Sequence, residues 1–336
     1  MLETLRNAFK IEDIRKRIGY TFLMLIVIRI GSQLPIPCVN SEVFANWFAN
    51  QGGDAFSFLD AITGGSFYQM SVFALNITPY ITSSIIIQLL TIAIPKLEEL
   101  QKDGEEGRKK ITKITRYLSV ILALVEAIAM AIGFGRSGYL DKFNVINVLL
   151  VVTTLTAGST ILMWIGERIT EKKVGNGMSI VLTINIVSRI PSDFATLYDT
   201  FVKGKTIAKG TLAALIIIAI VLVVVVFVLI LNGAQRKIPV QYSKKMQGRK
   251  MMGGQSSFIP LKVNTAGVIP IIFASSIMSM PVMIATFAGK SNMGGIGGEI
   301  LHGLSSSNWC NPDEPIYSIG LVVYVALCIF LSLIHI

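Results

Sequence analysis

TLAALIIIAIVLVVVVFVLIL, residues Thr211–Leu231, is a run of 21 residues without a single charged side chain. A helix of about 20 apolar residues is long enough to cross the hydrocarbon core of a bilayer. Hydrocarbon offers no hydrogen-bond partners to the backbone, so such a run must be helical. The 336 residues have a mean hydropathy of +0.65, with 52% hydrophobic and only 15% charged residues. The sequence therefore predicts an all-α membrane protein.

Seven further hydrophobic segments predict a bundle with eight spans. They are Ile18–Leu34, Ser71–Ile94, Leu118–Phe134, Val145–Ile165, Met178–Ile190, Ala266–Ala288 and Ile316 to the end. The 13 residues of Met178–Ile190 are few for a span. Charge nevertheless favours that span, because a cytoplasmic N-terminus then leaves 22 basic residues inside and 6 outside. Without it, the basic residues that follow Leu231 would lie outside.

The sequence does not indicate catalytic or cofactor-binding residues. Cys38, Cys310 and Cys328 are far apart and have no CxxC spacing, so they predict neither a disulfide framework nor a thiolate metal site. The two histidines, His302 and His335, have no HExxH pattern and no carboxylate at ligand spacing. We therefore expect no enzyme activity, no metal and no cofactor.

Two of the spans share a sequence pattern. NITPYITSSI (Asn76–Ile85) and NTAGVIPIIFASSI (Asn264–Ile277) both place Asn before Pro, then Ile, then Ser-Ser-Ile. The pattern is either a coincidence between two Ile-rich helices or an internal repeat, which in transport proteins places the substrate path between halves. Ile77, Ile81 and Ile85 lie on one helix face. That stripe either packs or faces lipid, or it forms a hydrophobic constriction that excludes water and ions.

Two loops carry further signals. Asn232–Thr265 holds seven basic residues and no acidic one, which suits either positive-inside topology with anionic lipid or docking of an acidic partner, RNA included. Ala55–Phe67 predicts a helix of about ten residues that ends at Gly64 and Gly65 and is too short to cross a bilayer. It either lies in the interface or folds inward against the bundle.

Several stretches carry a family resemblance. They are IGSQLPIP (Ile30–Pro37), NITPYITSSIIIQLL, EGRKKITKITRY, GNGMSI and NTAGVIPIIFASSIM. All resemble, in the same order, stretches of the SecY family, the channel subunits of the bacterial protein-export translocase.

The resemblance implies a polytopic helical bundle of ten spans in two pseudo-symmetric halves. Residues 1–190 would form the N-terminal half with spans one to five and a plug helix near 55–65. Residues 191–336 would form an incomplete C-terminal half with spans six to eight, because the chain ends within what resembles the eighth span. We therefore expect a C-terminally truncated chain that lacks the ninth and tenth spans.

The resemblance also implies function, location and partners. The chain would be the central subunit of a channel that passes unfolded secretory polypeptides across the bacterial plasma (inner) membrane and releases membrane segments sideways into lipid. Its N-terminus would be cytoplasmic. The expected partners are SecE and SecG in a heterotrimer, SecA, the ribosome, signal sequences, nascent polypeptides and membrane lipid.

Site residues carry over by motif position. The apolar ring that closes the pore resembles Ile77, Ile81, Met178, Leu182 and Ile272. Positions lining the lateral gate resemble Thr82, Gln88 and Met280. The plug resembles Ala55–Gly65, with Phe56, Phe58, Leu59 and Ile62 as its apolar residues. Cytoplasmic docking residues would be Arg108, Lys109, Lys110, Arg236, Lys237, Lys244, Lys245, Arg249 and Lys250.

A secondary solute transporter with an inverted-repeat fold is the alternative from another class. Such a protein needs polar or charged residues that converge near the midplane, around Pro79 and Pro270. The sequence offers Ile, Ser and Thr there. A membrane-embedded enzyme ranks third, because no span contains paired catalytic residues.

Overall fold

A computed structural model describes most of the chain. The described residues are 10–40, 43–44, 60–136, 138–140, 142–203, 207–240, 245–247, 250–252, 257–287, 296–305, 308–309 and 315–335. The chain divides into two compact units, which are treated separately below. The first contains Met1–Pro191 and Phe273–Ala326, and the second contains Ser192–Ile272 and Leu327–Ile336.

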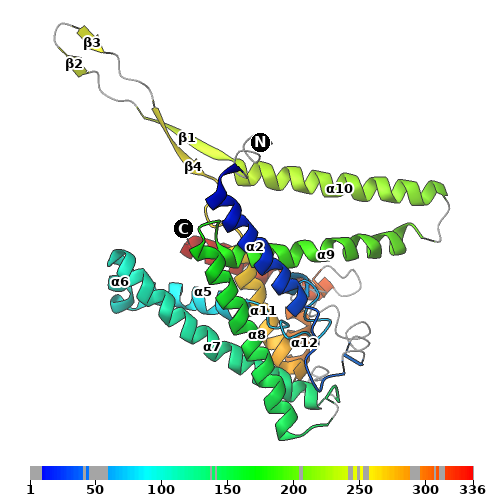
Figure 1. Cartoon of the computed structure of the whole chain (residues 1–336). Helices are drawn as coiled ribbons and strands as arrows, with labels where there is room; N and C mark the ends of the chain where they lie inside the picture. Colours follow the sequence, from blue (N-terminus) through cyan, green and yellow to red (C-terminus); the bar gives the residue numbers. More distant parts are fainter. Residues whose placement is uncertain are drawn as a thin grey trace. The chain divides into compact units, whose positions relative to one another are not determined.

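Helices dominate the described residues, which confirms the predicted helical membrane bundle (Figure 1). They are α2 (Glu12–Gly31), α5 (Thr78–Ala93), α6 (Pro95–Lys102), α7 (Gly104–Arg136), α8 (Val145–Glu171), α9 (Gly177–Phe201), α10 (Ile207–Gly233), α11 (Ile269–Phe287), α12 (Ile296–Leu304), the 3-10 turn η3 (Pro315–Tyr317) and α13 (Ser318–His335). Among the described residues, α7, α8, α9 and α10 are long and apolar enough to cross a membrane. The pair α5 and α6, bent by 104°, adds a fifth candidate.

Two predicted spans have different limits in the structure. Helix α5 begins at Thr78, because residues 71–77 form turns; Asn76 has a φ of +51°, which an α-helix does not accommodate. The predicted helical start at Ser71 is therefore wrong. Helix α9 continues beyond Ile190, through Pro191, to Phe201. The span predicted as 13 residues is thus a helix of 25 residues.

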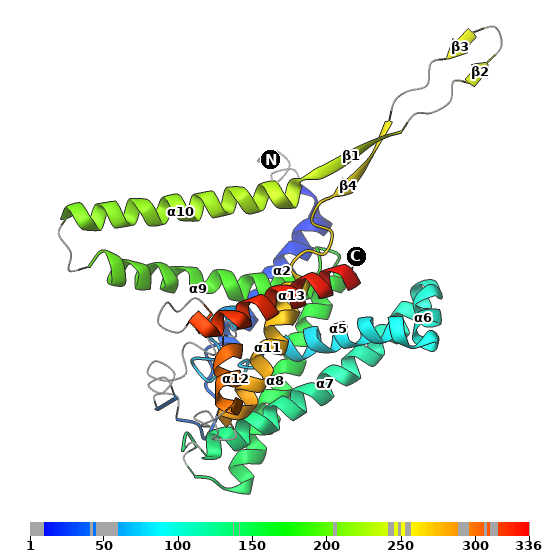
Figure 2. The ribbon, with the colours of Figure 1, turned by 180° about the vertical axis from the view of Figure 1, so that it is seen from behind.

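The first unit is built around α7, which packs against both α5 and α8, while α2 also contacts α8 (Figure 2). One part of its core is aromatic: the buried Phe44 ring meets the rings of Phe67, Phe134 and Tyr139 edge-on, at centroid distances of 5.8, 5.6 and 5.6 Å. Edge-on geometry places positive ring edges against negative ring faces. This cluster joins the C-terminal end of α7 to the turns that precede α5.

The second unit contains α10 and a β ribbon made by the basic loop. Strand β1 (Gln235–Val240) pairs antiparallel with β4 (Ser257–Lys262), from Gln235 opposite Lys262 to Val240 opposite Ser257. Beyond them β2 (Lys245–Gln247) pairs with β3 (Lys250–Met252). Figure 1 shows the ribbon as a narrow arm. The second unit therefore contains a β element that hydropathy did not reveal.

Candidate functional site

Three of the predicted ring residues meet in one apolar cluster of the first unit. Ile77, the N-cap of α5, is fully buried, Met178 is buried at the start of α9, and Leu182 packs against the same cluster. Ile81 is half-buried and is not part of that cluster. Ile272, also half-buried, belongs to the second unit. The structure thus brings three of the five predicted residues together.

The turn between α8 and α9 sets the position of Met178. Asn176 Oδ1 accepts hydrogen bonds from the backbone N–H groups of Met178 and Ser179, at 3.1 and 3.4 Å, and so caps the start of α9. A Cβ on Gly166 of α8 would collide with the Met178 side chain. A Cβ on Gly177 would overlap the carbonyl oxygen of Gly166. Gly166 and Gly177 therefore allow the close approach of α8 and α9 that buries Met178.

A cavity of about 180 Å³ lies between α5, α7, α11 and the turns before α5. Its wall includes Thr82 and Met280, two of the residues predicted for the lateral gate. The third, Gln88, is exposed farther along α5 and does not line it. The rest of the wall includes Thr63 and Phe67, and the surface that the wall exposes to the cavity is mostly apolar. The cavity could therefore accept an apolar side chain or a short apolar segment.

Glu126 of α7 also lines this cavity. It was not among the predicted site residues. Ser276 and Ser279 of α11 were likewise not predicted as cavity residues. The available signal was the isolated acidic residue in an apolar helix, because a charge inside a membrane segment usually faces a protein interior.

The described end of the predicted plug lies against the first unit. Ile62 is half-buried, whereas Phe56, Phe58 and Leu59 lie outside the described residues. Its neighbour Asp60 is buried and forms an ion pair with Arg189 of α9. Asn76 and Asn185 are joined by a buried hydrogen bond of 3.0 Å. Neither contact was predicted, because the partners are 129 and 109 residues apart.

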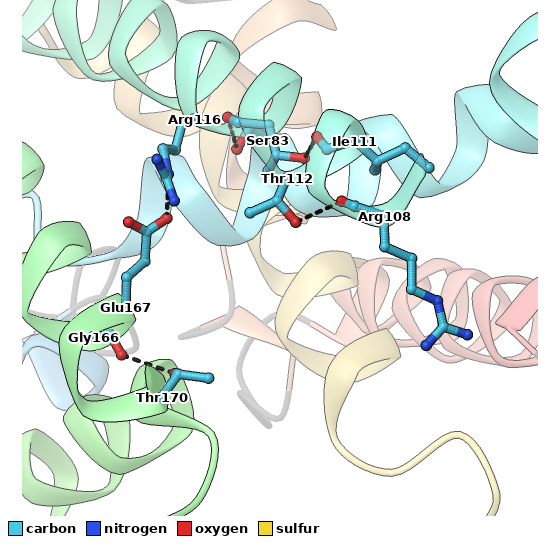
Figure 3. Close-up of polar contacts among 9 residues, drawn as sticks. Ser83, Arg108, Ile111, Thr112, Arg116, Gly166, Glu167 and Thr170 are labelled. Atoms are coloured by element: carbon cyan, nitrogen blue, oxygen red, sulfur yellow. Dashed lines mark hydrogen bonds and ion pairs between the residues drawn. The ribbon is translucent and has the colours of Figure 1, made fainter. Parts of the chain in front are cut away.

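Polar contacts join α5, α7 and α8 near Glu167, close to the C-terminal end of α8 (Figure 3). Arg116 of α7 pairs with Glu167 of α8, with 2.6 Å between Nε and Oε1. Ser83 Oγ of α5 donates to the carbonyl oxygen of Thr115, at 3.2 Å. Three helices are thereby joined at one level. The predicted docking residues Arg108, Lys109 and Lys110 precede this level on α7, and all three are exposed.

The basic β ribbon carries two of the other predicted docking residues on its described side chains. Arg236 and Lys237 are exposed on β1, and Lys237 Nζ lies 4.7 Å from the centre of the Phe258 ring on β4. Such a contact holds an ammonium over an aromatic face while leaving it accessible. Lys244 and Arg249 lie outside the described residues, as do the side chains of Lys245 and Lys250.

Comparisons with known proteins identify the family. The SecY family model matches residues 71–336. The protein translocase subunit SecY of Bacillus subtilis (strain 168) is 41% identical over 340 residues, which cover 98% of this chain and 74% of that protein. The chain belongs to the SecY family. The SecY of Halalkalibacterium halodurans is also 41% identical, over 87% of this chain and 68% of its own length.

Solved structures agree with the SecY fold. A structure described as a protein-conducting channel gives a TM-score of 0.59 at 18% identity, covering 94% of this chain and 71% of that one. Sec61 in the canine ribosome-channel complex from the endoplasmic reticulum gives 0.60, also at 18% identity, covering the same shares of the two chains. The family resemblance and the fold class predicted from the sequence are confirmed.

Proposed function

We propose that this chain is the central subunit of a Sec channel, which passes unfolded secretory polypeptides across the plasma membrane and releases apolar segments sideways into lipid. Its SecY-family membership supports the transport role. The cavity lined by Thr82 and Met280 supports the sideways release of apolar segments. It lies between α5, α7 and α11 and exposes mainly apolar surface. An apolar helix that enters there gains contact with protein while one side stays open to lipid.

Closure of the pore rests on the apolar cluster. Ile77, Met178 and Leu182 pack without side-chain hydrogen bonds to one another, so they can part and close again without breaking polar contacts. An apolar constriction excludes water and ions because wetting it is unfavourable. Ile81 and Ile272 complete the proposed ring. The plug, residues 55–65, would close the outer side.

The channel itself would supply no chemical energy. We infer that ATP hydrolysis by SecA, elongation at the ribosome and the proton-motive force drive transport, so that the chain is not an enzyme. The exposed basic residues near the start of α7 and on the β ribbon suit docking of SecA or the ribosome, since positive charge attracts acidic protein surfaces and RNA. SecE and SecG complete the proposed heterotrimer, with the N-terminus of this chain in the cytoplasm.

The alternative, a secondary solute transporter, is not favoured. The matched relatives are named as translocase subunits, and the matched structure is described as a protein-conducting channel. Although Glu126 and the serines of α11 lie on its wall, the cavity exposes mainly apolar surface, which favours an apolar occupant over a polar solute.

Photo-crosslinking tests the proposal directly. A benzophenone amino acid is placed at Thr82 or at Met280, and membranes are supplied with a ribosome-bound secretory chain stalled during export. We expect both positions to crosslink to the signal segment of the stalled chain, because both line the cavity. The measurement is the yield of crosslinked product on a gel.

Leu222 of α10 is the matched control position. It is 59% exposed, and α10 is expected to face lipid. Its crosslinks should go to lipid and not to the stalled chain. Equal yields from all three positions, or none from Thr82 and Met280 in membranes that contain the protein, would contradict the lateral-release assignment.

A further inference from the structure

Another cavity, of about 570 Å³, lies between α2 and α9 in the first unit. It is lined by side chains within residues 22–34, which belong to α2 and the segment directly after it, and by Ile184 of α9. We term it the α2 groove. Its volume is in the range of pockets that hold small organic ligands, and the surface that it exposes is almost entirely apolar. It is separate from the cavity that contains Thr82 and Met280.

The polar side chains of the α2 groove are gathered at one end. Arg29 is in the last turn of α2, and Gln33 comes two residues after the helix ends at Gly31. Phe22 and Ile26 line the groove farther back along the helix. Because Phe22 precedes Arg29 by seven residues, at about 1.5 Å per residue, the apolar floor extends roughly 10 Å along α2. The groove thus has a polar end and an apolar length, as a lipid molecule has.

Arg29 gives the polar end a positive charge. It is the one charged side chain among the lining residues of the groove, all of which the structure describes. Its Nη1 is buried and has no hydrogen-bond partner among the described residues. A buried donor without a partner is costly, and a charge inside a membrane segment usually meets an opposite charge. An anion is therefore the chemical complement of this end of the groove.

The apolar length selects among anions. The guanidinium of arginine binds phosphate through parallel N–H donors, and the exposed Gln33 has a further amide donor beside it. A small free anion would satisfy these donors and leave the apolar floor uncovered. An acyl chain would cover Phe22 and Ile26, which are 61% and 59% exposed. The combination of a phosphate and an acyl chain therefore fits the groove better than either group alone.

We propose that the α2 groove is a binding site for one phospholipid of the outer leaflet. Arg29 binds its phosphate, and one acyl chain lies along Phe22 and Ile26 and contacts Ile184 of α9. The choice of leaflet rests on the proposed cytoplasmic N-terminus, which places the C-terminal end of α2 on the outer side. The phosphate and the acyl chain are inferred from the groove itself and do not depend on the channel function.

A photoreactive lipid tests the site. Phosphatidylglycerol with a diazirine in one acyl chain is added at low mole fraction to detergent micelles that contain the purified protein, alone or in complex with SecE and SecG. After illumination, mass spectrometry of the digested protein measures the crosslinking yields at residues 22–34 and at residues 211–231 of α10. We expect the higher yield at residues 22–34, because α10 has no buried residue between 209 and 233 and lines neither cavity.

Substitution of Arg29 should have the largest effect on the yield at residues 22–34. Arg29→Gln should lower it about tenfold, because the charge-assisted hydrogen bonds to the phosphate are lost. Arg29→Lys should restore about half of the parent yield, since a lysine keeps the charge without the paired donors. Arg136→Gln is the matched control and should leave the yield unchanged. Arg136 is also in the last turn of a helix, α7, but it is exposed and lines neither cavity.

A larger side chain on α9 tests the apolar part of the site. Ile184→Trp should lower the yield at residues 22–34 about threefold, because the indole fills space that the acyl chain needs. The matched control is Ile186→Trp, since Ile186 is on the same helix, 48% exposed, and does not line the groove. Yields at residues 211–231 should be the same in all variants, which separates loss of the site from loss of the fold.

Two further compounds distinguish a phospholipid from other occupants. Diacylglycerol with the same diazirine chain lacks the phosphate, and it should label residues 22–34 no more than residues 211–231. Glycerol phosphate has the phosphate without acyl chains, and an excess of it should leave the phosphatidylglycerol yield unchanged.

Four results would overturn the proposal. They are a parent-like yield in Arg29→Gln, preferential labelling of residues 22–34 by diacylglycerol, competition by glycerol phosphate, which would assign the groove to a free anion, and loss of labelling in the complex with SecE and SecG, which would assign it to a partner helix. The measurement needs no transported polypeptide, so its failure is distinguishable from a failure of the proposed channel function.

Discussion

Helices α8 and α10 are both 27 residues long, yet they meet their surroundings in opposite ways. Ten residues of α8 are buried, and they include Gly158, Ser159 and Gly166 among apolar neighbours. Helix α10 is more apolar, but none of its residues from Thr211 to Gly233, all of which the structure describes, is buried. In a membrane, lipid is as apolar as a leucine side chain, so burial against protein depends on close packing and polar contacts.

The largest expected difference comes from the same truncation made in both helices. Leu155 of α8 is fully buried, and Leu222 of α10 is 59% exposed. Leu155→Ala should lower the free energy of unfolding by about 2–5 kcal/mol because it leaves a cavity. Leu222→Ala should cost less than about 1 kcal/mol, since lipid fills the space. Equilibrium denaturation of the purified chain in mixed micelles measures both, and equal losses would contradict the difference in packing.

Replacing a glycine by alanine where two segments are in close contact should have the next largest effect on the free energy of unfolding. A Cβ on Gly158 would overlap the carbonyl oxygen of Val72, whereas a Cβ on Gly233 at the end of α10 meets nothing within 4 Å. Gly158→Ala should therefore cost about 1–3 kcal/mol through overpacking. The same denaturation measurement should find no loss for Gly233→Ala. A neutral Gly158→Ala would mean that the chain at Val72 can move away from α8.

Ser159 tests how much a hydrogen bond from α8 to another segment contributes to stability. Its hydroxyl donates to the carbonyl oxygen of Asn76, which lies outside α8, at 3.0 Å. Ser159→Ala leaves that buried carbonyl without this donor and should cost about 1 kcal/mol. The control is Thr160→Ala, because Thr160 donates only to Thr156 of its own helix, at 2.7 Å. If the two variants lose equal stability in mixed micelles, the inter-helix hydrogen bond contributes nothing specific.

Hydropathy and motif order predicted much of this molecule. Each of the eight apolar segments overlaps a helix of the structure, and the motifs identified the family correctly. Residues 71–77 were assigned to a helix because they are apolar, but those side chains are buried in protein turns and not in lipid. Hydropathy reports the removal of a side chain from water and does not distinguish these two environments.

The sequence did not predict which residues far apart in the chain contact each other. Asn76 and Asn264 begin similar motifs, but the structure uses them differently: Asn76 joins three segments, whereas the exposed Asn264 accepts a hydrogen bond from the nearby backbone N–H of Gly267, at 3.0 Å. Periodicity places a residue on a helix face and does not name the residue it meets. The pair between Arg189 and Asp60, 129 residues apart, was not predicted for the same reason.

The smallest expected effect concerns the ion pair at the end of α8. The side chains of Arg116 and Glu167 are 48% and 17% exposed, and partly exposed pairs contribute up to about 1 kcal/mol. Arg116→Gln should lower stability by no more than this at low ionic strength, and the loss should disappear in about 1 M salt, where the screening length falls to roughly 3 Å. The α8 variant Leu155→Ala should be insensitive to salt by comparison. A loss in Arg116→Gln that persists at high salt would mean that the pair is shielded from solvent, and that this end of α8 is held as firmly by charge as its middle is by packing.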